Sequence, residues 1–66
     1  MKVDGEKLRR LREEKVLTMK QTAELAGVSY NTLYRLEHNK TGARQQSIKA
    51  LARVFGVGPG ELVGDG

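Results

Sequence analysis

The sequence contains no cysteine, which excludes disulfide bonds and thiolate metal sites as sources of stability. No apolar run approaches the roughly 18 residues that a membrane-spanning helix requires. The first ten residues, MKVDGEKLRR, carry charges instead of the apolar segment of a signal peptide. From these absences we expect a soluble, cytoplasmic protein with no membrane partner.

Residues suited to catalysis or metal binding are equally scarce. His38 is the single histidine; an imidazole without cysteine or facing carboxylates is a poor metal site, and without an adjacent nucleophile it is a poor general base. Glu13 and Glu14 are neighbours in sequence, so on a helix their side chains point about 100° apart and do not form a carboxylate pair. No glycine-rich phosphate loop is present. We therefore predict no enzyme activity, no cofactor and no metal.

What remains is a short, basic chain. Its 66 residues allow one domain, which we expect to span 1–66, with a modest core. Twelve Lys and Arg against eight Asp and Glu give a formal net charge of +4. A basic surplus on so small a body favours a polyanion such as nucleic acid as the partner.

Hydrophobic periodicity predicts an all-α fold, a compact bundle of about five short helices without strands. The clearest repeat has the i, i+3, i+4 and i+7 spacing of a helix with one buried face, and consists of Ile48, Leu51, Ala52 and Phe55. Gly56 is placed to end this helix, and Pro59 suits the first position of a short last one. The predicted helices span about 4–15, 19–26, 30–38, 45–55 and 59–63.

The second and third predicted helices are joined by a tight turn. Thr18 and Ser29 are residue types that cap helix N-termini, and Gly27 can adopt the positive φ at which many helices end. In the helix after the turn, Leu33 and Leu36 fall on the inner face, and polar side chains occupy the outer face. A helix, a glycine turn and a second helix with a hydrogen-bonding outer face form the plan of a helix-turn-helix DNA reader.

The chain resembles a known family, the Cro/CI-type (XRE-like) helix-turn-helix domain of phage repressors and related transcriptional regulators, whose fold is lambda-repressor-like. The resemblance covers nearly the whole chain. It rests on LREEK at 11–15, Leu17-Thr18, Ala23, AGVS at 26–29, Thr32-Leu33, RLE at 35–37, Lys40 and the run Ile48-x-x-Leu51-Ala52-x-x-Phe55-Gly56-Val57. The closing GPGELV at 58–63 resembles the family's usual short fifth helix.

The resemblance implies that the third helix is a recognition helix, which lies in the major groove of double-stranded DNA. Its outward residues are then expected to contact base edges: Tyr30, Asn31, Tyr34 and Arg35. Their chemistry agrees independently, because arginine can pair with guanine, and asparagine with adenine, through two hydrogen bonds each. A second group is expected to contact phosphates: Thr18, Lys20, Gln21, Ser29, Thr32, Asn39, Lys40, Thr41 and Arg44.

Two further roles follow from the resemblance. Glu37 is expected to form an ion pair with Arg12, which links the end of the recognition helix to the first helix; the alternative is a solvated carboxylate at a helix end. A dimer interface is expected in the C-terminal part, at Val57, Pro59, Leu62 and Val63. The two tyrosines also have an alternative role, as a hydrophobic pair that stabilises the helix surface.

Some positions depart from the family's usual residues. Val16 stands where glycine is common, and because valine resists positive φ, we predict another geometry at the end of the first helix. Met19 replaces a glutamine that can donate to a phosphate, so that contact is either missing or made by one of the next two residues. Thr22 replaces a usual leucine, and we expect Leu25 to compensate in part.

The first hypothesis is a sequence-specific transcriptional regulator, in its simplest form a repressor, that binds a two-fold operator as a homodimer and responds to no small-molecule effector. A phage or plasmid switch and a restriction-modification controller are regulators of this type. The alternative is an antitoxin or another protein-interaction module. An extra tail or an exposed apolar face would favour that alternative, and the sequence indicates neither, apart from the short C-terminal apolar cluster.

Overall fold

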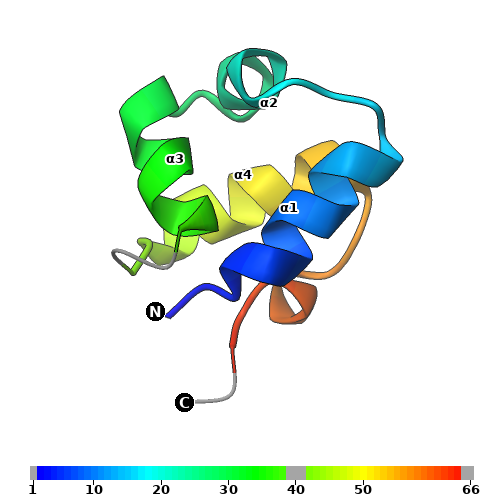
Figure 1. Ribbon diagram of the computed structural model, residues 1–66. Helices are drawn as coiled ribbons and strands as arrows, with labels where there is room; N and C mark the ends of the chain where they lie inside the picture. The colour runs from blue at the N-terminus through cyan, green and yellow to red at the C-terminus, as the bar shows by residue number, and fades with distance from the viewer. Residues whose placement is uncertain (1, 39–41, 65–66) are drawn as a thin grey trace.

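A computed structural model describes residues 2–38 and 42–64 as an all-α unit (Figure 1). Its elements are α1 (Gly5–Glu14), α2 (Met19–Ala26), α3 (Tyr30–Glu37), α4 (Gln45–Phe55) and the 3₁₀ turn η1 (Pro59–Glu61). The all-α class was predicted correctly, but the described residues form four α-helices and not about five, because the chain makes only a single 3₁₀ turn where a helix was predicted at 59–63. Every helix in the described ranges is too short or too polar to cross a bilayer.

Local side-chain chemistry explains where three helices begin. The Asp4 carboxylate accepts hydrogen bonds from the backbone N–H groups of Glu6 and Lys7, at 3.1 and 3.2 Å. Ser29 Oγ accepts from the Thr32 N–H at 3.1 Å, which starts α3. Thr18 caps α2 in the same way. Each interaction satisfies N–H groups that have no partner within the helix.

The core lies between the four helices. Six long aliphatic side chains in it are at most 1% exposed: Leu8, Leu33, Leu36, Ile48, Leu51 and Leu62. Figure 1 shows α4 crossing the middle of the molecule, with α2 at the top and α3 at the left. α2 packs against both α3 and α4, and α1 packs against α3. This packing buries the inner face of α3 and leaves its outer face uncovered.

The two ends of the described chain are hydrogen-bonded to each other. Val3 and Val63 form an isolated antiparallel bridge, and the Asp4 N–H donates to the Leu62 carbonyl at 2.9 Å. The Leu62 side chain is fully buried beneath this bridge. The prediction that Leu62 belongs to a dimer interface is therefore wrong, because this side chain is part of the monomer's own core.

The end of α1 also differs from the prediction. Val16 has φ +54°, in the left-handed region that valine was expected to avoid. The Val16 N–H donates to the Glu13 carbonyl and the Leu17 N–H to the Arg12 carbonyl, at 2.9 and 3.2 Å, which is the bonding pattern of a Schellman motif. The hydrogen bonds of this turn therefore fix the geometry that glycine usually adopts, and a β-branched side chain occupies it.

Val16 should for this reason be a site of stored strain. Its side chain is 88% exposed, so replacing it removes almost no buried surface. Left-handed backbone costs a non-glycine residue about 1–2 kcal/mol, while glycine loses about 0.5–1 kcal/mol through backbone entropy. We expect Val16→Gly to raise the free energy of unfolding by about 0.5–1 kcal/mol in urea denaturation. The control is Lys15→Gly, at a negative φ, which should lower it; a Val16→Gly variant that is equally destabilised would contradict the assignment of strain.

Thr22 and Leu25 also differ from the expectation. Thr22 is fully buried, and its hydroxyl donates to the Thr18 carbonyl at 2.9 Å. The hydroxyl is thus satisfied within its own helix, and the small side chain fits in the core. Leu25 does not compensate for the missing leucine, because it is 64% exposed.

Candidate nucleic-acid interface

The outer face of α3 carries the four residues that were predicted to contact bases. Tyr30, Asn31, Tyr34 and Arg35 are all exposed, whereas Leu33, on the opposite face, is buried. Their i, i+1, i+4 and i+5 spacing places them on one side of the helix. This face therefore presents two phenol rings, an amide and a guanidinium to solvent.

Beside this face is a polar hollow between α3 and the start of α4. It is lined by Val28, Ser29, Thr32, Arg35, Gly42, Arg44 and Ser47. The structure thus brings two arginines, predicted to contact a base and a phosphate respectively, to one concave site. Ser47 was missed in the sequence because only the fold brings the start of α4 beside this hollow. The combination of guanidinium and hydroxyl groups suits an anionic partner.

Ser29 and Thr32 are hydrogen-bonded to each other within the hollow. Their hydroxyl oxygens lie 2.8 Å apart, and Ser29 Oγ also accepts from the Thr32 N–H at 3.1 Å. One of the two hydroxyl protons is used in the bond between them, so the pair retains one hydroxyl proton for a phosphate.

The N-terminus of α2 forms a second group of possible phosphate donors. The Gln21 N–H donates to Thr18 Oγ1 at 3.0 Å, and the Thr18 N–H donates to Gln21 Oε1 at 2.9 Å, a reciprocal capping box. These bonds use the acceptor oxygens of both side chains. The Thr18 hydroxyl proton and the Gln21 amide protons remain available, at the helix end where the dipole favours an anion. Gln21 can thereby supply the amide donor that Met19 lacks.

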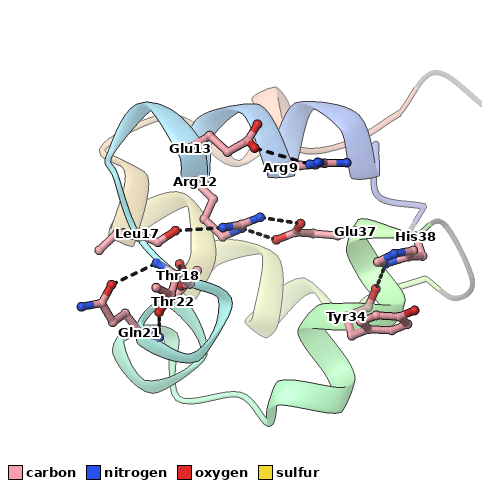
Figure 2. A network of polar contacts seen from close by, with 10 residues as sticks. All are labelled: Arg9, Arg12, Glu13, Leu17, Thr18, Gln21, Thr22, Tyr34, Glu37 and His38. Carbon is pink, nitrogen blue, oxygen red and sulfur yellow. Dashed lines mark hydrogen bonds and ion pairs between the residues drawn. The ribbon is translucent and has the colours of Figure 1, made fainter.

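The C-terminal end of α3 is joined to α1 by a bidentate ion pair (Figure 2). Arg12 Nε donates to Glu37 Oε2 at 2.7 Å and Arg12 Nη2 to Glu37 Oε1 at 3.2 Å. A third bond runs from Arg12 Nη1 to the Leu17 carbonyl at 2.8 Å. The two side chains are only 13% and 3% exposed. The predicted Arg12–Glu37 pair is thus present, and Arg12 also holds the turn that follows α1.

Three residues that were predicted to contact phosphates lie outside the described residues: Asn39, Lys40 and Thr41. Of the predicted dimer residues, Pro59 is exposed, while Val57 and Val63 are half-buried against the core.

One interaction on α3 was not foreseen. His38 caps the helix, and its ring stacks on Tyr34 (Figure 2), with 3.9 Å between ring centroids and 19° between planes. Sequence reasoning considered His38 only as a metal ligand or a base. The i, i+4 spacing of an aromatic pair at the end of a helix was the available signal.

The chain belongs to the helix-turn-helix family HTH_3, whose sequence profile matches residues 8–62. It is 43% identical over 54 residues to the HTH-type transcriptional repressor RghR of Bacillus subtilis (strain 168), a match that covers 80% of this chain and 40% of the repressor. The chain thus spans less than half the length of that relative.

Two solved structures show the same fold in different settings. SinR, a master regulator of biofilm formation from Bacillus subtilis, is 28% identical in its complex with DNA, with a TM-score of 0.80 over 85% of this chain and 90% of that one. A mutant of hydroxyethylphosphonate dioxygenase is 32% identical, with a TM-score of 0.86 over 98% of this chain but 14% of the enzyme. The fold therefore occurs both in a DNA-bound regulator and as a small part of an enzyme.

Proposed function

We propose that this protein is a sequence-specific DNA-binding transcriptional regulator, which represses by occupying its operator. The observation that carries the proposal is the outer face of α3, where the exposed side chains that were predicted to contact bases lie beside a hollow lined by Arg35 and Arg44. The net charge of +4 and the similarity to a repressor and to a DNA-bound regulator support it.

In this proposal α3 lies in the major groove. Arg35 donates to guanine O6 and N7, and Asn31 pairs with adenine N6 and N7. Thr18, Gln21 and Thr32 donate to phosphates on the groove edges, which fixes the register of α3 without reading sequence. The Arg12–Glu37 pair lies away from the DNA-facing side and holds the C-terminal end of α3 against α1.

The operator is proposed to be two-fold and its reader a homodimer. One recognition helix contacts only a few base pairs, and two helices in a dimer reach successive major grooves about 34 Å apart. With Leu62 buried, the dimer contact is proposed around exposed Pro59 and the accessible parts of Val57 and Val63.

A second candidate function, as a protein-interaction module, is favoured by one observation. Between α2 and α4 lies a groove lined by Leu25, Ala26, Ala50, Arg53 and Val54, with Leu25 mostly exposed. The sequence had indicated no such apolar face outside the C-terminal cluster. The likeness to a small part of a dioxygenase shows that a unit of this fold also occurs within an enzyme.

The salt dependence of binding to random duplex DNA separates the two candidates. A homodimer that makes about six phosphate contacts should give a slope near −5 in a plot of log K against log salt concentration, hence about 10³-fold weaker binding at 200 mM than at 50 mM salt. Fluorescence anisotropy with a labelled duplex measures this slope. A flat dependence, or no binding at low salt, would exclude DNA binding and leave the interaction module.

A further inference from the structure

His38 makes two contacts with Tyr34: a hydrogen bond to its backbone carbonyl and a stack on its ring. Nδ1 lies 2.8 Å from the Tyr34 carbonyl oxygen (Figure 2). Because a carbonyl oxygen only accepts, Nδ1 must carry the proton of this hydrogen bond. The imidazole is therefore fixed to the backbone of the residue whose side chain it covers.

The fixed imidazole covers one face of the Tyr34 ring. A helical side chain lies over the turn that precedes it, so the His38 imidazole reaches back to Tyr34, one turn earlier. The stacking distance of 3.9 Å and the angle of 19° leave the two rings nearly parallel. Tyr34 lies on the outer face of α3 and is 41% exposed. The stack with His38 therefore restricts a ring that is otherwise partly open to solvent.

His38 also lies near the ion pair at the C-terminal end of α3. It lines a small hollow together with Arg9, Arg12, Met19 and Glu37. His38 is thus placed between the surroundings of the Arg12–Glu37 pair and the outer face of α3, where it stacks on Tyr34.

We propose that His38 is a positioning residue for DNA recognition, which holds the Tyr34 ring in the orientation that α3 presents to base edges. This inference rests on the proposed DNA-binding function. Its physical basis is preorganisation: a side chain that is free in the unbound protein and fixed in the complex lowers the affinity, and one that is already fixed does not.

The test compares His38→Ala with His38→Phe, which keeps a ring over Tyr34 but loses the hydrogen bond. Affinity for a duplex obtained by selection from random DNA should fall about twofold to tenfold in His38→Ala and stay within about twofold in His38→Phe. In a Tyr34→Ala background, His38→Ala should have no further effect. In free His38→Ala the NMR shifts of the Tyr34 ring protons should move towards those of an unstacked tyrosine. Thermal unfolding of each variant confirms that the fold is retained.

The outcomes separate the inference from the function on which it rests. Equal losses in the alanine and phenylalanine variants, or the same loss with and without Tyr34, would overturn the positioning role, because His38 would then act through its hydrogen bond or by touching DNA itself. Unchanged affinity in all His38 variants of a protein that binds DNA would overturn it as well. If the wild-type protein binds no DNA, the proposed function fails and this inference fails with it.

Discussion

Replacement of Glu37 by leucine is expected to lower the free energy of unfolding by about 3 kcal/mol, because it leaves the Arg12 guanidinium buried without its counter-charge. The two side chains are 13% and 3% exposed, so water cannot solvate the remaining charge without opening the junction of α1 and α3. Only the bond from Arg12 to the Leu17 carbonyl survives. In a domain of this size the loss corresponds to a fall in melting temperature of roughly 12–24 °C.

Thermal and urea unfolding followed by circular dichroism measure this effect. The double variant Arg12→Met/Glu37→Leu should be less destabilised than Glu37→Leu alone, because apolar side chains of similar size then fill the site without a lone charge. Glu13→Ala is the matched control: it removes the exposed partner of Arg9, at 3.6 Å, and should change stability by less than about 0.5 kcal/mol. A Glu37→Leu variant as stable as Glu13→Ala would show that the buried pair contributes nothing.

Replacement of Arg35 by alanine should weaken binding to the selected DNA site by about 1–3 kcal/mol and relax the base preference at one position. The reason is the loss of two hydrogen bonds to a single guanine. Binding to random duplex DNA should weaken much less. Competition anisotropy with the selected site, its single-base variants and random DNA gives all three quantities.

Arg53→Ala is the control for this prediction, because it removes the same charge from the exposed side of α4 that borders the α2–α4 groove. It should leave the specificity ratio unchanged. Arg35 also lines the hollow beside α3, where it could contact a phosphate instead. If Arg35→Ala weakens specific and random DNA by the same factor, Arg35 is a phosphate contact and the base assignment is wrong.

The parts of the fold that could be predicted depend on neighbours in sequence. Asp4, Thr18 and Ser29 cap helices through backbone groups two or three residues away, so their residue type is sufficient evidence. Gly27 ends α2 at φ +71° for the same local reason. The apolar repeat of α4 likewise needs only the period of a helix.

The parts that could not be predicted depend on contacts between distant segments. Leu62 belongs to an apolar cluster near the end of the chain, and its burial depends on the packing of the last turn against α4 and on the bridge between Val3 and Val63. A valine at position 16 disfavours a positive φ on its own. The hydrogen bonds of the turn, together with the bond from Arg12 to the Leu17 carbonyl, hold Val16 at positive φ despite this preference. Leu25 was expected to compensate for the leucine that Thr22 replaces. In the structure Thr22 is itself buried, with its hydroxyl bonded to the Thr18 carbonyl, and Leu25 is exposed.

The candidate site divides in the same way. The outward residues of α3 follow from helical spacing, so Tyr30, Asn31, Tyr34 and Arg35 could be placed on one face from the sequence. The hollow that adds Ser47 to this face requires the fold, which brings the start of α4 beside α3. The hydrogen bond between the Ser29 and Thr32 hydroxyls requires atomic positions.

In vitro selection of binding sites from random duplex DNA shows whether α3 reads a DNA sequence. We predict a two-fold consensus with half-sites about one helical turn apart, and with a guanine in each half-site whose preference disappears in Arg35→Ala. A selection that returns no consensus from a protein that is folded and binds DNA would contradict sequence reading by α3. A consensus that survives unchanged in Arg35→Ala would contradict the assignment of that residue.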